Sequence, residues 1–68
     1  MTDTKELRRR IEESGLKYGY IAKQIGITCY TLQMKIDNDS EFRVSEVDKL
    51  SEILGLSLAD KDAIFFAK

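Results

Sequence analysis

The apolar residues of this chain recur every three or four positions, which is the spacing of one buried face of an α-helix. Alternating apolar and polar positions, the mark of a half-buried strand, do not extend over any useful length. The sequence contains no proline, so we expect helices to end at glycines and at the polar stretch 37–41. These signals predict an all-α fold in a single domain, residues 1–68. Five helices are expected, at about residues 4–14, 18–25, 29–37, 45–54 and 57–67.

The central part of the chain contains the pattern around which the other helices are expected to pack. Ala22 is followed four residues later by Gly26 and six residues after that by Leu32, the spacing of a helix-turn-helix motif. Gly26 is expected to end the first helix of the pair with a positive φ, a conformation that glycine adopts without strain. Thr28 stands where the second helix needs an N-cap. A helix-turn-helix places its second helix in the major groove of DNA.

Charge is unevenly distributed along the chain, although the formal net charge is only −1. Residues 1–36 contain seven lysines and arginines and four acidic residues, for a net charge of +3. Residues 37–68 contain four basic and eight acidic residues, for a net charge of −4. DNA responds to the local field of a protein, so the N-terminal half is the candidate for a nucleic-acid contact. An ordinary solvated surface carries a similar imbalance, so charge alone does not separate the two interpretations.

The composition argues against several other classes of function. With one cysteine and no histidine, the chain lacks the ligands of a structural zinc site and an evident nucleophile–base pair. We therefore expect no metal, no cofactor and no enzymatic activity, and no small-molecule ligand in a chain too short for a cleft. No apolar run approaches the roughly 20 residues that span a membrane. The single cysteine and the absence of a signal peptide indicate the cytoplasm.

A family resemblance is carried by Ala22, Gly26 and Leu32, by the run MKIDNDSEFRVSEVDKLSEILGL that follows, and by the terminal AIFFAK. Over about residues 4–58 the chain resembles the lambda-repressor-like helix-turn-helix domains of the Cro/C1 or Xre type. More narrowly, it is similar to a small family of phage and prophage regulators of Gram-positive bacteria. The resemblance implies a five-helix DNA-binding fold and a sequence-specific transcriptional regulator, a Cro-like or Xre-type repressor.

The resemblance also implies roles for individual residues of the motif. The third helix would be the recognition helix, with Cys29, Tyr30 and Gln33 at the positions that face DNA bases. Tyr18 and Thr28 would lie at helix N-termini against the sugar-phosphate backbone. These assignments give a candidate site for double-stranded DNA.

Two departures from the family pattern concern the same region. Asp37 and Asn38 stand where Asn-Gly is usual, which puts a negative charge near the phosphates. Tyr18 and Cys29 stand where many phage repressors have glutamines. The operator sequence of better-known members therefore does not transfer to this chain.

The side chains of the third helix differ in how specifically they point to a base contact. Gln33 is the best candidate, because its amide can bond to N6 and N7 of adenine, and a solvated surface glutamine is the alternative. Tyr30 suits a thymine methyl group or a phosphate, and equally a half-buried packing role. Cys29 suits a small apolar contact in the groove more than a redox function. Met34 is expected to be partly buried.

Basic residues around the motif are candidates for phosphate contacts, each of which releases counterions from the DNA. The lysines are Lys17, Lys23 and Lys35, and solubility of the surface is their alternative role. Among the three consecutive arginines of the first helix, Arg10 is expected to lie nearest the second helix.

Two adjacent aromatic residues near the end of the chain suggest a contact between copies. Phe65 and Phe66 point about 100° apart on a helix, so only one of them can enter the core. The other predicts a C-terminal contact in a homodimer, and the alternative is that both rings pack on Leu56 and Leu58. A dimer would present two recognition helices about 34 Å apart, one for each half-site.

Two functions of different classes fit these observations. The first is a sequence-specific DNA-binding regulator that represses by occupying its operator. The second is a protein-interaction module that keeps the helix-turn-helix fold but has lost or weakened DNA binding. The second is favoured by a third helix without arginine, in which Lys35 is the one basic residue, and by the acidic C-terminal half.

Overall fold

Five α-helices account for most of residues 1–67, the part of the chain that the computed structural model describes. They are α1 (Thr4–Ser14), α2 (Tyr18–Ile25), α3 (Cys29–Ile36), α4 (Val44–Leu54) and α5 (Leu58–Phe65). No strand occurs in that range, so the predicted all-α class is confirmed. The predicted domain extends to Lys68, which lies outside the described residues. None of the helices within residues 1–67 has the length and apolar character needed to cross a membrane.

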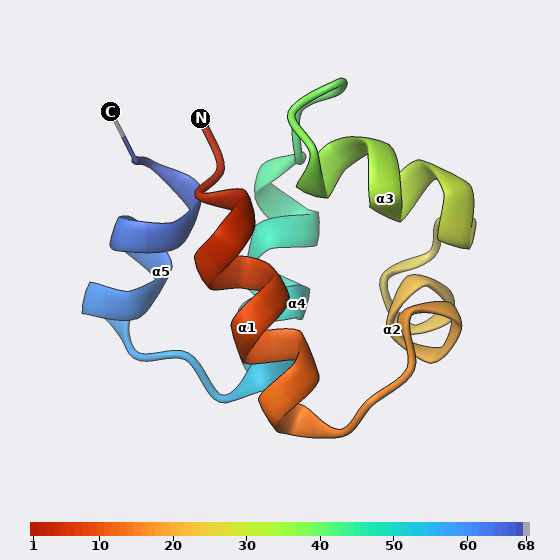
Figure 1. Cartoon of the computed structure of the whole chain (residues 1–68), viewed down its shortest axis with the longest axis horizontal. Helices are drawn as coiled ribbons and strands as arrows, with labels where there is room; N and C mark the ends of the chain where they lie inside the picture. Colours follow the sequence, from red (N-terminus) through yellow and green to blue (C-terminus); the bar gives the residue numbers. More distant parts are fainter. Residues whose placement is uncertain (68) are drawn as a thin grey trace.

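The first helix occupies the centre of the arrangement and packs on α3, α4 and α5. Figure 1 shows α4 behind it, α5 on one side, and α2 and α3 on the other. α2 in turn packs on α3 and α4. The start of the chain lies beside α5, because the backbone N–H of Asp3 donates to the carbonyl of Ile64 over 2.7 Å. α3 therefore lies at one edge of the molecule, supported from beneath by α1 and α2.

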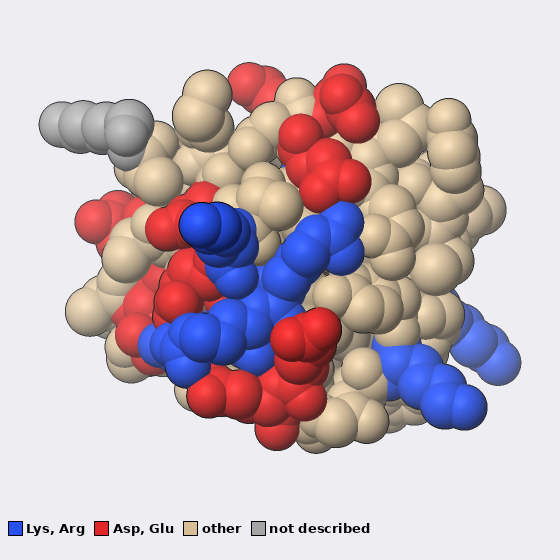
Figure 2. Space-filling model, in the orientation of Figure 1, with Lys and Arg blue, Asp and Glu red and all other residues tan. Residues whose placement is uncertain are grey.

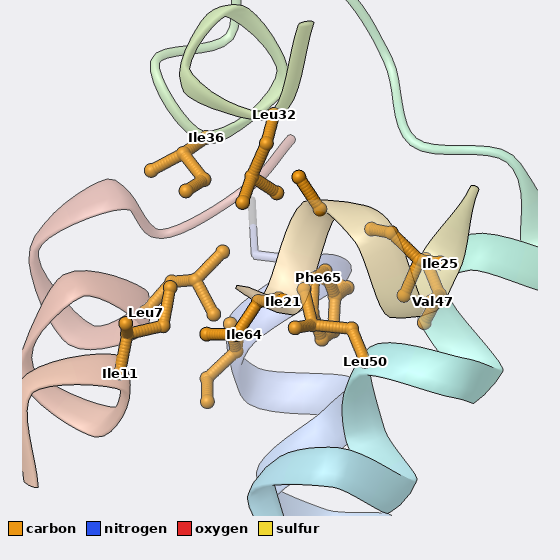
Figure 3. Packing of buried hydrophobic residues seen from close by; sticks show 11 residues of the cluster. Leu7, Ile11, Ile21, Ile25, Leu32, Ile36, Val47, Leu50, Ile64 and Phe65 are labelled. Carbon is orange, nitrogen blue, oxygen red and sulfur yellow. The ribbon is translucent and has the colours of Figure 1, made fainter. Parts of the chain in front are cut away.

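A single apolar core receives side chains from every helix, and Figure 3 shows them converging between the elements. Spacings of three and four residues bring them to one face of each helix, as in Leu7 and Ile11 of α1 or Leu32 and Ile36 of α3. Burial of each such aliphatic side chain contributes about 1.5–3 kcal/mol. The buried hydrophobic residues are Leu7, Ile11, Ile21, Ala22, Ile25, Leu32, Ile36, Val47, Leu50, Ile64 and Phe65.

Side-chain caps begin three of the helices, and one of them is the cap predicted at Thr28. A carboxylate oxygen of Asp3 accepts from the backbone N–H of Glu6 at the start of α1. Thr28 Oγ1 accepts from the N–H of Thr31 at 3.1 Å, which begins α3. Ser57 Oγ accepts from the N–H of Asp60 at 3.0 Å and begins α5. Each cap satisfies a backbone donor that lacks a partner within its helix.

Helix α4 begins one residue earlier than predicted, at Val44 instead of Ser45. The residue before it is Arg43, whose side chain cannot accept a hydrogen bond. The capping contact runs in the opposite direction: the backbone N–H of Arg43 donates to Glu46 Oε1 over 2.8 Å. A carboxylate from inside the first turn thus caps α4 in place of a side chain at the residue before the helix.

The end of α5 also differs from the prediction, because the helix stops at Phe65 and does not reach residue 67. Phe65 is buried, with 5% of its surface exposed, and its ring meets that of Phe42 edge to face at 5.4 Å. Phe42 thereby anchors the loop before α4. Phe66 is 57% exposed. Only one of the two rings therefore enters the core, as predicted. The buried ring is that of Phe65, so Phe65 is removed from the predicted dimer contact and Phe66 remains.

The C-terminal end of α3 is tied to the start of the chain by Asn38. This residue has a left-handed backbone, with φ of 65°, a conformation that asparagine tolerates better than most residues. Its side-chain oxygen accepts from the N–H of Thr2, and its amide nitrogen donates to the carbonyl of Thr2, each at 2.9 Å. The hydroxyl of Thr4 donates to the carbonyl of Ile36 at 2.6 Å. Asparagine therefore suits this left-handed position, because its side chain also joins the end of α3 to the start of the chain.

Replacement of Gly26 by valine should destabilise the domain by about 1–2 kcal/mol, because an L-residue resists a left-handed backbone and β-branching adds to the cost. Gly26 has φ of 82°, and no atom lies within 4 Å of an added Cβ, so the cost is in the backbone and not in a clash. Thermal unfolding followed by circular dichroism should show a lower Tm, by about 4–8 °C for each kcal/mol.

Gly19→Ala is the matched control for Gly26→Val. Gly19 lies inside α2 with open space around the added Cβ, so alanine should raise the Tm through its better helix propensity. An unchanged Tm in Gly26→Val would contradict the role assigned to this turn.

Candidate functional site

The first turn of α3 is the most exposed part of the predicted site. Residues 26–28 connect it to α2, and the backbone N–H of Ile27 donates to the carbonyl of Ala22 over 3.0 Å, which keeps the connection tight. Thr28 caps the helix, since its Oγ1 accepts from the backbone N–H of Thr31, and Thr28 is itself exposed. Cys29 and Tyr30 are exposed, with 74% of Tyr30 accessible. These side chains are free to meet a partner outside the chain.

The outward face of α3 continues along the helix beyond Tyr30. Met34 lies four residues after Tyr30 and therefore shares its face, opposite Leu32 and Ile36. Its partial burial is confirmed. Met34 was not predicted as a contact residue, although its spacing of four residues from Tyr30 is enough to place the two side chains on one face. Figure 2 shows that the surface over this part of the molecule carries few charged side chains.

A cluster around Arg8 connects three helices at the other flank of α3. Arg8 Nη2 donates to Gln33 Oε1 over 3.0 Å and to Asp37 Oδ1 over 2.8 Å. Arg8 Nη1 donates to the hydroxyl of Tyr18 over 3.4 Å, and the guanidinium carbon lies 5.7 Å from the centre of that ring. The hydrogen bond that Arg8 donates to Asp37 raises the pKa of Arg8 above its usual value. Gln33 and Tyr18, predicted as separate contact residues, thus belong to one network.

The remaining arginines of α1 face away from this cluster. Arg10, expected nearest to α2, donates to Asp60 of α5 over 2.9 Å and to Glu6 over 3.0 Å. Arg9 pairs with Glu6 and Glu13 on its own helix. A hydrogen bond from Arg9 and a smaller effect of the one from Arg10 hold the pKa of Glu6 well below its usual range. Figure 2 shows basic and acidic side chains interleaved over α1. The excess positive charge of the N-terminal half therefore does not form a continuous basic patch there.

The lysines of the predicted site divide into two groups. Lys17 precedes α2 and Lys23 lies in its last turn, both are exposed, and neither forms an ion pair within residues 1–67. Lys35 is buried, with 7% of its surface exposed, and its Nζ lies 2.5 Å from Glu46 Oε1 on α4. Lys35 follows the buried Leu32 by three residues and so shares its inward face. The predicted phosphate contact of Lys35 is therefore removed from the candidate site.

The buried pair of Lys35 and Glu46 has a defined effect on the carboxylate. Burial by itself raises the pKa of Glu46, but the bonds from the Lys35 ammonium and the Arg43 backbone N–H outweigh it, so the net pKa is below 4.5. Because the pKa of Glu46 is lower in the folded state than in the unfolded state, the ionised carboxylate stabilises the fold at pH values above the unfolded-state pKa. This contribution is lost as the pH falls through the folded-state pKa.

Comparison of the chain with models of protein families, with curated proteins and with solved structures finds no match.

Removal of one partner of the buried pair, in Lys35→Met, should destabilise the protein by about 3–5 kcal/mol, because Glu46 is left as an unpaired buried charge. Urea unfolding followed by circular dichroism measures this loss. Replacement of both partners, in Lys35→Met with Glu46→Gln, should recover most of the stability, since glutamine still accepts the Arg43 N–H.

The pH dependence provides an independent measurement of the same pair. The unfolding free energy of the unmodified protein should decrease below about pH 4.5, and the double variant should lack the part of that decrease due to Glu46. Equal acid sensitivity in the two proteins would contradict the role assigned to the pair.

Proposed function

We propose that this protein is a sequence-specific DNA-binding transcriptional regulator, a repressor of the Cro or Xre type as in phages and prophages. In this proposal α2 and α3 form a lambda-repressor-like helix-turn-helix, and α3 enters the major groove. The observation that carries the proposal is the start of α3, where the exposed Cys29 and Tyr30 follow a left-handed glycine and a threonine cap.

The proposed contacts divide by their chemistry. Cys29, Tyr30 and Gln33 face base edges, and Met34 extends the same surface. The backbone of the DNA is contacted by two lysines, one before α2 and one in its last turn, and by the polar groups at the starts of α2 and α3. These residues are Lys17, Tyr18, Lys23 and Thr28. The division matters because phosphate contacts supply affinity and base contacts supply specificity.

The proposed regulator acts as a homodimer that blocks transcription by occupying its operator. Phe66 supports this part of the proposal, because its exposed ring borders the same hollow as the exposed Met1. Both residues line a hollow of about 350 Å³, which is also lined by the buried Phe65 and the partly buried Phe42. The lining residues are Met1, Thr2, Asn38, Glu41, Phe42, Val47, Phe65 and Phe66. A ring from a second copy would cover this apolar surface.

A protein-interaction module is the second candidate, and one observation favours it. All three arginines of α1 are engaged with carboxylates, and the lysine of α3 is buried, so few basic groups remain for phosphates. Non-specific affinity for DNA depends on such groups. This candidate therefore predicts weak binding without sequence preference.

Selection from randomised duplex DNA separates the two candidates, with the recovered pool measured by fluorescence anisotropy at two salt concentrations. The regulator should recover a palindrome whose half-sites are about one helical turn apart. Recovery of no sequence, together with weak and salt-sensitive binding, would reject the regulator and favour the interaction module.

Gln33→Ala and Lys23→Ala should affect binding to the recovered operator in different ways. Gln33→Ala should relax the preference at one base position per half-site, with a loss of about 1–3 kcal/mol for the preferred base. Lys23→Ala should weaken binding to all sequences alike and reduce the salt slope by about one unit. Anisotropy titrations with the operator and its single-base variants measure both effects, and an unchanged preference in Gln33→Ala would reject its assigned role.

Phe66→Ser should shift the protein toward the monomer in sedimentation equilibrium, because it removes the exposed ring of the proposed contact. Leu58→Ser is the matched control, since Leu58 is also highly exposed but lies outside the hollow. A dimer of equal strength in Phe66→Ser, or no dimer in the unmodified protein at any accessible concentration, would reject this contact.

A further inference from the structure

The contacts of Gln33 differ from those of a free surface glutamine. Its side-chain oxygen accepts from Arg8 Nη2 over 3.0 Å, and the same nitrogen donates to Asp37. An arginine side chain has donors and no acceptor, so the amide atom that faces it has to be the oxygen. The orientation of the amide is thereby determined, and its NH₂ group is the part that remains for a partner outside the chain.

Arg8 is itself held in place from three sides. Asp37 accepts from Nη2 over 2.8 Å, the Tyr18 hydroxyl accepts from Nη1, and the guanidinium lies over the Tyr18 ring. A guanidinium is planar and presents its donors in a fixed fork, so these contacts fix the direction of the donor that reaches Gln33. Because Asp37 follows Gln33 by four residues, both acceptors lie on the flank of α3 that faces α1.

We propose that Arg8 is a positioning residue which orients the Gln33 amide so that it recognises guanine and not adenine; this inference rests on the proposed DNA-binding function. A bidentate contact with adenine requires the glutamine oxygen to accept from N6 while the nitrogen donates to N7. In this protein the oxygen is occupied by Arg8, and donors alone face outward. Guanine presents two neighbouring acceptors, N7 and O6, in the major groove, whereas adenine presents one acceptor and one donor.

The experiment compares base preference at the operator position that Gln33 reads. That position is defined as the one whose preference is lost in Gln33→Ala, and all four base pairs are then tested there by anisotropy. The unmodified protein should prefer guanine over adenine by about 10-fold, within the range that such contacts give. Arg8→Met should reduce this preference to about twofold or less, or reverse it in favour of adenine, because the amide is then free to turn.

Arg9→Met is the matched control for Arg8→Met. It removes the same positive charge from the same helix, and its partners Glu6 and Glu13 also belong to α1. It should keep the guanine preference while showing the same general loss of affinity. This comparison separates orientation of Gln33 from the loss of one charge in the field of the protein.

Arg8→Lys serves if Arg8→Met does not fold. The ammonium keeps the charge and the aliphatic stem, but it bonds the Asp37 carboxylate in preference to the neutral Gln33 oxygen. The same loss of guanine preference is therefore expected.

The outcomes separate failure of this inference from failure of the proposed function. Absence of any selected sequence rejects DNA recognition itself. A selected operator in which adenine is preferred at the Gln33 position, or a guanine preference that survives in both Arg8 variants, overturns the role of Arg8 and leaves the regulator standing. If Gln33→Ala changes the base preference at no operator position, the role proposed for Arg8 is overturned as well.

Discussion

The inward side of α3 is the constraint on which the rest of the fold depends. Leu32 and Ile36 fill the core, and Lys35 between them reaches Glu46 of α4 through a buried ion pair. Glu46 also accepts the backbone N–H that begins α4, so one carboxylate fixes both the start of that helix and its position against α3. A carboxylate without these two donors would be strongly disfavoured in this environment. The pair therefore ties the placement of α3 to the start of α4.

Other contacts hold the two ends of α3 in different ways. At its start, the left-handed Gly26 and the hydroxyl of Thr28 set the direction in which the helix leaves α2. At its end, Asn38 joins the helix to the first residues of the chain. Between them, Arg8 attaches one flank to α1 and α2. α3 thus has both ends and two sides held, and its remaining surface is left for a partner.

The sequence was sufficient to predict the helices, because their positions depend on local signals. Apolar spacing, capping residues and glycines at helix ends act within a few residues, and α1 and α2 have the predicted bounds. That only one of Phe65 and Phe66 enters the core was predictable in the same way. Which of the two rings does so depends on the angle at which α5 meets the loop containing Phe42. That angle is a property of the whole packing.

The errors in the candidate site have the same origin. Lys35 was assigned to the surface because a lysine is almost always exposed unless it is paired, and its partner lies on another helix, which a local pattern does not reveal. Arg8, and not Arg10, faces α2 because successive helical residues differ by about 100° in direction, so the choice depends on how α1 is rotated in the fold. The start of α4 was predicted one residue too late, at Ser45, because the helix is capped by Glu46, which accepts the backbone N–H of Arg43.

The division of α3 into a free first turn and a tethered later part has a consequence for how this protein can evolve. Cys29 and Tyr30 extend outward and make no side-chain contact that supports the fold, so substitutions there change the outer surface at little cost in stability. Gln33 and Asp37 share a donor from α1, so a change at either one disturbs an interhelical contact as well. Divergence of recognition is therefore expected to begin at the first turn. Changes further along the helix would require compensating substitutions on α1.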